Sequence, residues 1–381
     1  MKVAIVVPHI FMHRNILSKV IFSPGTLAID LAEGLAREGL EVTLATPGPI
    51  DTVVPNITAD LSTFEAELVD RGDTYIDLLK KHPLTFITLA RQVQSELIAN
   101  IYKRANDGEF DVVHVYTNEE DIALPFADLC RKPVLFTHHD PFNFLVKYKA
   151  VFPKYKHLNW LSISDSQRRG MPDDTNWLDT IYHGIDPAAF SPIDDPSNDY
   201  IAYLGRIIEP KGVHLAIHAV KSYNQNNPNT PLKLKIAGKH YSGKKDKYWQ
   251  DKILPYIDTV EIEYVGFIND RATKQEFLGN ARALIIPSVF EEPFGMVMIE
   301  ALACGTPIIG LNSGAIPEVI TAKSGILVTK EDELTNIDNL SHALAAINAI
   351  DRTACRLEFE ERFTLKRMCL SHIAAYEKLI G

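Results

Sequence analysis

Residues 287–307 guide the interpretation of the whole chain, and they read PSVFEEPFGMVMIEALACGTP. The apolar run at 283–286 just before them is short and is bounded by Pro287, which is typical of a buried strand. Residues 295–304 then predict a helix, because Gly305 is well placed to end it. The stretch therefore predicts a buried strand, a loop and a helix in succession.

This stretch contains a pair of carboxylates with unusual surroundings. Glu300 is the only charged residue of the expected helix, whose other residues are apolar or small, so the helix should be buried on nearly every side. A carboxylate buried there needs partners, because an unpaired buried charge is expensive. Glu292 lies in the loop that leads to the helix N-terminus, where backbone N–H groups favour an anion. Either the two acids form part of a binding site, or Glu300 is satisfied by a buried arginine or by backbone amides and Glu292 is solvated.

Size and composition exclude several classes of protein. The chain has 381 residues, which suggests two domains, and its 46% hydrophobic and 23% charged residues are ordinary for a globular protein with a full core. The formal net charge of −10 argues against a nucleic-acid partner and against an unaided electrostatic hold on anionic lipid. Any phosphate site must therefore be made locally, by a few placed Lys and Arg side chains.

Cysteine usage and the N-terminus bear on the compartment. Four cysteines without a Cys-x-x-Cys pair, and no histidines at metal-ligand spacing, argue against a structural zinc site and a disulfide framework. The opening MKVAIVVP is too short and too strand-like for a signal peptide, and no apolar run approaches the roughly 18 residues of a membrane span. We therefore expect a cytoplasmic protein with at most peripheral membrane contact.

Strand and helix patterns alternate along the chain. The β-branched run at 3–7 predicts a buried parallel strand. Ser23 as N-cap and Pro24 at the first helical position then predict a helix that stops at Gly39. The further strands expected from apolar runs are 41–46, 111–115, 133–137, 160–164, 180–182, 200–204, 232–237, 260–265, 283–287, 307–310 and 326–328. The alternation implies parallel sheets.

A segment at 190–200, rich in Pro, Asp and Ser, divides this series and reads as a linker. The pattern predicts an α/β protein of two doubly wound halves, which we assign to residues 1–192 and 193–362. Residues 363–381 carry apolar residues at helical spacing and predict a terminal helix.

The stretch at 287–307 resembles the donor-site motif of glycosyltransferase family 4, in which two glutamates are separated by seven residues, here Glu292 and Glu300. This family is retaining and has the GT-B fold, with two Rossmann-like domains facing across a cleft. The resemblance spans nearly the full chain and is strongest at 201–328. It implies an N-terminal acceptor domain, a C-terminal nucleotide-sugar donor domain, and a terminal helix that crosses back to the first domain.

A second motif, Gly205-Arg206-Ile-Ile-Glu-Pro-Lys211-Gly212, directly follows an expected strand. Glycines permit close backbone approach, and the Arg and Lys add positive charge, a combination that suits a phosphate. By itself the motif could equally be a surface turn with two solvated cations. It resembles the Gly-Arg-x4-Lys-Gly element of the family, which implies that Arg206 and Lys211 hold the donor diphosphate.

Other positions of the second half match the nucleotide-sugar site of this family. The resemblance implies that Glu300 holds the ribose and that Glu292 holds hydroxyls of the transferred sugar. The other donor-binding positions that it implies are Gly205, Gly238, Lys239 and Ile268 around the nucleotide, and Phe294, Gly295 and Met296, whose amides would sit near sugar and phosphate.

In the first half the match is patchier. The Thr-x-His element at 137–139 puts His139 at a strand end facing the cleft, where it could touch the transferred sugar; the alternative is a polar residue that caps a strand. Residues 161–168, 176–177 and 180–186 resemble one branch of the family, which includes glucosyltransferases acting on tetrahydrobiopterin and one from avilamycin biosynthesis.

The loop after the first strand departs from the family pattern. The family usually has Gly-Gly there, close to the donor phosphates and the acceptor, whereas this chain keeps a single glycine, Gly25, after Pro24. The departure puts the acceptor pocket in doubt. The candidates for acceptor binding are Gly25 with His13 and Arg14, and the same loop also carries His9 and Lys19.

The resemblance implies a retaining glycosyltransferase that moves a hexose from a nucleoside-diphosphate sugar to a hydroxyl on a small molecule, glycan or lipid-linked acceptor. Arg206 and Lys211 would stabilise the charge that develops on the diphosphate, with His139 and Glu292 as the other catalytic residues. An Asp-x-Asp motif is missing from any suitable place, so we expect no obligatory metal and no other cofactor. The alternatives are a nucleotide-sugar epimerase and a non-catalytic nucleotide-sugar binding protein of the same fold.

Overall fold

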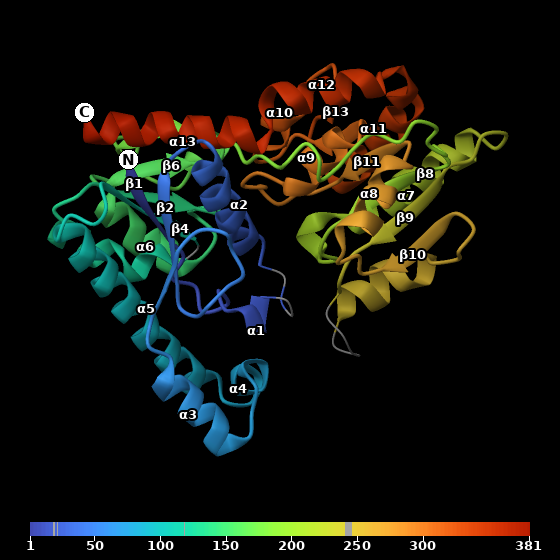
Figure 1. Cartoon of the computed structure of the whole chain (residues 1–381). Coiled ribbons are helices and arrows are strands. Elements are labelled where there is room, and N and C mark those ends of the chain that lie inside the picture. The colour runs from blue at the N-terminus through green and yellow to red at the C-terminus, as the bar shows by residue number, and fades with distance from the viewer. Residues whose placement is uncertain (18–19, 21, 118, 241–245) are drawn as a thin grey trace. The chain divides into compact units, whose positions relative to one another are not determined.

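Two parallel sheets organise the chain, one in each of two compact units (Figure 1). The structure is a computed structural model that describes residues 1–17, 20, 22–117, 119–240 and 246–381. The first unit comprises Met1–Tyr182 and Leu365–Gly381, and the second comprises His183–Thr364. The C-terminal segment is thus part of the same unit as the N-terminus.

The first unit contains a seven-stranded sheet in the order β3-β2-β1-β4-β5-β6-β7, with every pair parallel. Its strands are β1 (Lys2–Val6), β2 (Glu41–Thr46), β3 (Asn56–Thr58), β4 (Val112–Thr117), β5 (Val134–His138), β6 (Asn159–Ser162) and β7 (Trp177–Thr180). This is the strand order of a Rossmann sheet, with one strand added at the edge.

Helices cover both faces of this sheet. They are α1 (Arg14–Leu17), α2 (Ser23–Arg37), α3 (Ser62–Arg71), α4 (Tyr75–Lys81), α5 (Pro83–Asn106), α6 (Val146–Val151) and α13 (Leu365–Ile380). Strand β4 shows how the faces are filled, because successive side chains point to opposite sides. Val113 and Val115 join the apolar cluster of Leu97 on α5, whereas the Nδ1 of His114 is hydrogen-bonded to the Tyr376 hydroxyl on α13 at 2.8 Å.

The second unit contains a six-stranded parallel sheet in the order β10-β9-β8-β11-β12-β13. Its strands are β8 (Tyr200–Leu204), β9 (Lys233–Ala237), β10 (Ile262–Gly266), β11 (Ala283–Ile286), β12 (Ile308–Leu311) and β13 (Gly325–Val328). Its helices are α7 (Val213–Asn226), α8 (Arg271–Gly279), α9 (Met296–Ala303), α10 (Ile316–Val319), α11 (Glu333–Ala346) and α12 (Arg352–Arg362). This order is again that of a Rossmann sheet, so the predicted fold class, α/β with two doubly wound halves, is confirmed.

The prediction of a Ser23 N-cap was wrong. The helix α2 is capped by Phe22, whose side chain makes no capping hydrogen bond, and Ser23 is already helical. The first turn closes one residue earlier than expected, because the Gly25 N–H donates to the carbonyl O of Phe22 at 3.1 Å. Gly39, which we expected to end this helix, has a φ of +95°, the left-handed conformation that glycine adopts most readily.

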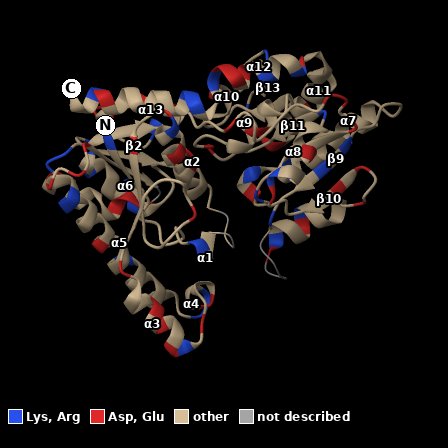
Figure 2. Ribbon diagram, in the orientation of Figure 1, with Lys and Arg blue, Asp and Glu red and all other residues tan. Residues whose placement is uncertain are grey.

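The segment predicted as a linker, residues 190–200, is part of the second unit and packs within it. Phe190 is buried, and its carbonyl O accepts a hydrogen bond from Nη1 of Arg356 on α12 at 2.8 Å. Basic and acidic residues are interspersed along the elements of each unit (Figure 2). No helix in the described part of the chain is both long enough and apolar enough to cross a membrane.

Candidate functional site

The topology of the second unit indicates which edge of its sheet is the candidate ligand site. In a Rossmann sheet, ligands bind outside the carboxyl ends of the strands, where the strand order reverses. Here the reversal lies between β8 and β11, which are paired neighbours. The turns that follow these two strands are residues 205–212 and 287–295, the two stretches that the sequence singles out.

Backbone contacts lock these two turns together. The N–H groups of Val289 and Phe290 both donate to the carbonyl O of Pro210, at 3.0 and 3.1 Å. Gly212 has a φ of +69°, and a Cβ added there would lie 2.0 Å from the carbonyl O of Pro287. Only glycine permits this approach, so the motif glycine is required by the packing of one turn on the other.

The side chains of the two turns meet in an ion pair. Lys211 donates through Nζ to Oε1 of Glu292, and the Ser288 hydroxyl donates to the same oxygen at 2.9 Å. The Lys211 and Glu292 side chains are 17% and 10% exposed. The ammonium also lies 5.2 Å from the ring centroid of Phe290. A largely desolvated cation and carboxylate, each with a second contact, therefore sit at the reversal point.

The second glutamate also has a lysine partner. Glu300 lies on α9, and its Oε1 accepts from Nζ of Lys274 on α8 at 2.7 Å. Their side chains are 27% and 12% exposed for lysine and glutamate respectively. Neither an arginine nor a backbone amide is needed to account for this carboxylate. Burial raises the pKa of the neighbouring Cys304 thiol to about 12, and the Glu300 charge adds to that shift.

Helix α9 begins within this site. Gly295 is its N-cap, with a φ of +98°, and the helix then runs from Met296. The side chain of Phe294 is not part of a binding surface, because it is 2% exposed and packs edge-on against His183 at a centroid distance of 5.0 Å and against Phe363 at 6.1 Å. Its backbone amide remains the candidate group at this position.

Two further turns border the site. A Cβ on Gly238, after β9, would lie 1.9 Å from the carbonyl O of Gly205, so the turns after β8 and β9 also touch through glycine. Gly314, after β12, approaches the backbone of Glu292 equally closely, with a φ of +57° and a hypothetical Cβ 2.3 Å from the Glu292 nitrogen. Of the remaining expected positions, Arg206 and Lys239 are exposed and Ile268 is half-buried.

In the first unit, His139 directly follows β5 and is buried. Its ring packs edge-on against Tyr116, with the centroids 4.4 Å apart. The preceding residue, His138, is hydrogen-bonded through Nδ1 to Oε2 of Glu120 at 3.0 Å. Burial holds the pKa of the Glu120 carboxyl well above its usual range. Sequence reasoning missed this buried pair.

The expected acceptor residues are packed in different ways. His13 is buried, its Nδ1 accepts from the Asn15 N–H at 3.0 Å, and its ring occupies the space beside Gly48. Burial lowers the pKa of His13. Arg14 is exposed at the start of α1, and Gly25 is buried in α2. Lys19 lies outside the described residues.

Sequence reasoning also missed the two residues that hold the glutamates, Ser288 and Lys274. Ser288 stands in the recognised motif, but a serine after a strand carries no signal of its bond to a carboxylate four residues on. Lys274 lies 26 residues before Glu300 and reaches it only because α8 packs against α9. Among the described residues, no group of three or more His, Cys, Asp or Glu side chains is arranged to hold a metal ion.

Comparisons with known proteins agree with this architecture. The family model described as Glycosyltransferase Family 4 matches residues 25–188, and that described as Glycosyl transferases group 1 matches residues 189–350. An uncharacterized glycosyltransferase of Methanocaldococcus jannaschii is 26% identical over 78% of this chain and 79% of its own.

Solved structures resemble the chain over its full length. HepE of Anabaena, determined with UDP and glucose, has a TM-score of 0.68 at 16% identity and matches the whole of both chains. AviGT4, a glycosyltransferase involved in avilamycin A biosynthesis, has a TM-score of 0.64 at 18% identity and matches all of this chain and 98% of its own. With two family models that adjoin over residues 25–350 and a Rossmann-like unit under each, the chain belongs to glycosyltransferase family 4 and has the GT-B fold.

Proposed function

We propose that this glycosyltransferase transfers a hexose from a nucleoside-diphosphate sugar to a hydroxyl acceptor, with retention at the anomeric carbon and without an obligatory metal ion. The observation that supports this most directly is the Lys211–Glu292 pair at the reversal point of the second sheet. Arg206 lies on the same turn as Lys211 and is exposed. One turn thus offers two cations beside a carboxylate, which suits a ligand that joins phosphates to a polyol.

The two cations suit the charge that the reaction produces. Cleavage of the sugar–phosphate bond leaves negative charge on the diphosphate, and preorganised donors aimed at developing charge are an effective form of catalysis. Arg206 and Lys211 would bind the diphosphate in this role. Because two cations on one turn would neutralise the leaving group, the transfer would not need a divalent ion.

The two glutamates suit hydroxyl groups. Glu292 has a second oxygen besides the one held by Lys211 and Ser288, and we assign it to hydroxyls of the transferred sugar. Glu300 likewise keeps one oxygen besides that held by Lys274, and we assign it to the ribose. Carboxylates accept hydrogen bonds from hydroxyls through both oxygens. The amides of Phe294, Gly295 and Met296 complete the donor site near the sugar and phosphate.

The nature of the donor is supported by a neighbour of the same fold. HepE was solved with UDP and glucose, and in another structure with UDP-glucose, so a relative of this architecture holds a nucleoside diphosphate and a hexose. On the side of the first unit, we assign His139 to the transferred sugar. The expected acceptor contacts are His13, Arg14 and Gly25.

A panel of nucleoside-diphosphate sugars, incubated with and without hydroxyl acceptors, tests this proposal. Transfer predicts a free nucleoside diphosphate and a glycoside whose anomeric configuration, read by proton NMR, matches that of the donor. A new nucleotide sugar formed without acceptor would indicate an epimerase instead. A thermal shift without turnover would indicate a binding protein, and an inverted product would refute retention. Lys211→Met serves as the control, because turnover that this variant leaves undiminished arises from another enzyme in the preparation.

A further inference from the structure

A glutamine in the first unit holds the backbone on both sides of His139. Gln167 lies in a 3₁₀ helix, Ser166–Arg168, that follows β6, and it is 3% exposed. Its Nε2 donates to the carbonyl O of His138 at 2.7 Å and to that of Asp140 at 3.0 Å. These are the residues immediately before and after His139. One side-chain amide therefore holds the peptide group just before His139 and the peptide group just after Asp140.

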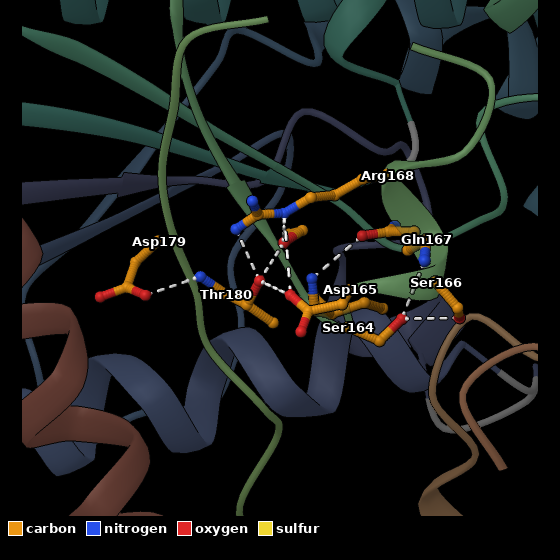
Figure 3. Close-up of polar contacts among 9 residues, drawn as sticks. Ser164, Asp165, Ser166, Gln167, Arg168, Asp179 and Thr180 are labelled. Atoms are coloured by element: carbon orange, nitrogen blue, oxygen red, sulfur yellow. Dashed lines mark hydrogen bonds and ion pairs between the residues drawn. The ribbon is translucent and has the colours of Figure 1, made fainter. Parts of the chain in front are cut away.

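The amide is itself fixed at its other end. The Gln167 Oε1 accepts from the Ile163 N–H at 3.0 Å, and the backbone N–H of Gln167 donates to the Ser164 hydroxyl at 3.1 Å (Figure 3). These bonds identify the amide orientation, because the oxygen faces an N–H donor and the nitrogen faces two carbonyls. Both N–H donors and the oxygen of the side-chain amide thus have partners, and the flipped amide would satisfy none of them.

The same turn also contacts the backbone further along the segment that follows β5. Gly170 has a φ of +95°, and a Cβ there would lie 3.0 Å from the backbone nitrogen of Asn143. The backbone after β5 is therefore clamped by Gln167 at 138–140 and packed against Gly170 at 142–143. A strand end that would otherwise begin a free loop is fixed at two places by the turn after β6.

We infer that Gln167 is a positioning residue for His139, which sets the direction of the imidazole and acts on glycosyl transfer only through it. The inference rests on the proposed function, since it takes His139 as the group that touches the transferred sugar. Because the peptide planes before His139 and after Asp140 are both held by Gln167, the backbone of this two-residue segment is restrained and with it the direction of the His139 Cα–Cβ bond. Packing against Tyr116 at a centroid distance of 4.4 Å then limits the ring. Small misplacements of a reacting group cost on the order of 10²-fold in rate.

The neighbouring residue provides a matched control. Arg168 is on the same turn, but it reaches toward Thr180 and Asp165, away from Gln167 (Figure 3). Its Nε donates to the Ser162 hydroxyl at 2.9 Å and its Nη2 to Thr180 Oγ1 at 2.6 Å. Arg168→Met therefore removes side-chain hydrogen bonds from this turn without touching the backbone around His139.

Gln167→Glu is the main test. It preserves the volume and the acceptor for Ile163, but it removes both donors and places a carboxylate against two carbonyl oxygens. Gln167→Met removes the donors without adding charge, and it carries the test if the charged variant does not fold. Each change is made in the wild type and in His139→Ala, and turnover is measured with UDP-glucose or with whichever donor of the panel is turned over.

Three results are expected. Both Gln167 variants lower kcat by on the order of 10- to 100-fold while the donor KM stays within about twofold, because the donor contacts lie on other residues. Arg168→Met keeps kcat within about threefold at a comparable thermal midpoint. In the His139→Ala background the Gln167 changes lower kcat by less than about threefold further, since residues that act as a unit are not additive.

The cycle separates failure of the inference from failure of the function. If His139→Ala is impaired and the Gln167 changes lower kcat equally in both backgrounds, Gln167 supports the fold alone and the inference is wrong, while the proposed function stands. If Arg168→Met loses as much kcat as Gln167→Met, the turn acts as a whole and the inference is again wrong. If His139→Ala keeps the wild-type kcat, the role assigned to His139 falls and the inference falls with it.

Discussion

Replacing each of the two cations of the 205–212 turn by methionine should affect catalysis alike but stability differently. Lys211 is largely buried in its pair with Glu292, whereas Arg206 is exposed. Under the proposed function, both changes should lower kcat/KM by on the order of 10², about 2.7 kcal/mol, because each would remove a charge-assisted contact to the leaving diphosphate. Only Lys211→Met should also lower the stability of the second unit.

The size of the stability loss follows from the burial of the pair. Removing one partner of a fully buried ion pair costs about 3–5 kcal/mol, because the other charge is left uncompensated. Glu292 is 10% exposed and keeps the Ser288 hydroxyl as a donor, so we expect about 2 kcal/mol for Lys211→Met. Arg206→Met should stay within about 0.5 kcal/mol, as is usual for an exposed side chain.

Calorimetry measures this difference, provided that the unfolding of the second unit is resolved from that of the first. For a unit of this size, about 2 kcal/mol corresponds to a midpoint lowered by roughly 4–8 °C. The double variant Lys211→Met/Glu292→Gln is the control, because it removes the orphaned charge while the amide oxygen still accepts from Ser288. It should regain most of the lost midpoint but none of the lost kcat/KM.

Three outcomes would contradict this reasoning. An unchanged midpoint in Lys211→Met would show that the ion pair contributes nothing to the fold. A double variant as unstable as the single one would mean that Glu292 is not the source of the loss. Near-normal kcat/KM in both Lys211→Met and Arg206→Met would show that the turn carries two solvated cations and no phosphate site.

Three more predictions follow from the site and from the core of the first unit. Glu300→Gln should raise the donor KM more than it lowers kcat, and it should narrow the preference for ribo- over 2′-deoxynucleotides. Glu292→Gln should instead lower kcat and leave the affinity for the free nucleoside diphosphate, measured by calorimetry, almost unchanged. The opposite pattern would show that the roles of the two glutamates are reversed. Donor turnover should persist in excess EDTA, and a rate that collapses and returns with Mn²⁺ or Mg²⁺ rules out metal independence. Burial lowers the pKa of His372 from 6.5 to about 4, so between these pH values the unfolded chain binds more protons than the folded one. The first unit should therefore be fully stable above about pH 6.5, and its free energy of unfolding should fall by about 3 kcal/mol toward pH 4. His372→Gln should flatten that pH dependence in thermal unfolding curves, and an equally steep curve would contradict the assignment.

Local signals in the sequence were sufficient for the sheets. The strands Glu41–Thr46 and Tyr200–Leu204 have the predicted bounds, because their apolar runs are flanked by polar or turn-forming residues. The helix before Cys304 was placed equally well, because glycines bound it: Gly295 is its N-cap, and Gly305 adopts the positive φ that commonly follows the end of a helix.

Elements whose placement depends on distant contacts were missed. The edge strand β3 has three residues, too few for an alternating pattern, and it exists because Leu44 and its neighbours on β2 supply the pairing. The helices α3 and α4 are short, and their buried residues Phe64, Leu68 and Leu78 pack with α5 in a cluster of their own. Such packing is a property of the folded unit and leaves no short-range periodic signal.

The same division applies to the candidate site. The sequence marked Glu292, Glu300, Arg206 and Lys211 by motif, but it could not show that Lys211 and Glu292 bond to each other. Their partnership spans 81 residues and depends on the pairing of β8 with β11. The motif thus identifies the chemical groups, and the sheet determines which of them are neighbours.

That pairing affects how a donor would enter the site. Without a donor, Lys211 is neutralised by Glu292, so a diphosphate that draws the ammonium away leaves the carboxylate with Ser288 alone. A sugar hydroxyl can replace the lost donor, whereas a free diphosphate brings none. An intact donor would therefore leave neither charge unpaired, but the spent diphosphate would leave Glu292 short of one partner, which favours its release after transfer. A glutamine at this position carries no charge to compensate, so by the same argument it should not weaken the binding of the free diphosphate. The kcat should still fall, because the glutamine weakens the proposed contact with the transferred sugar.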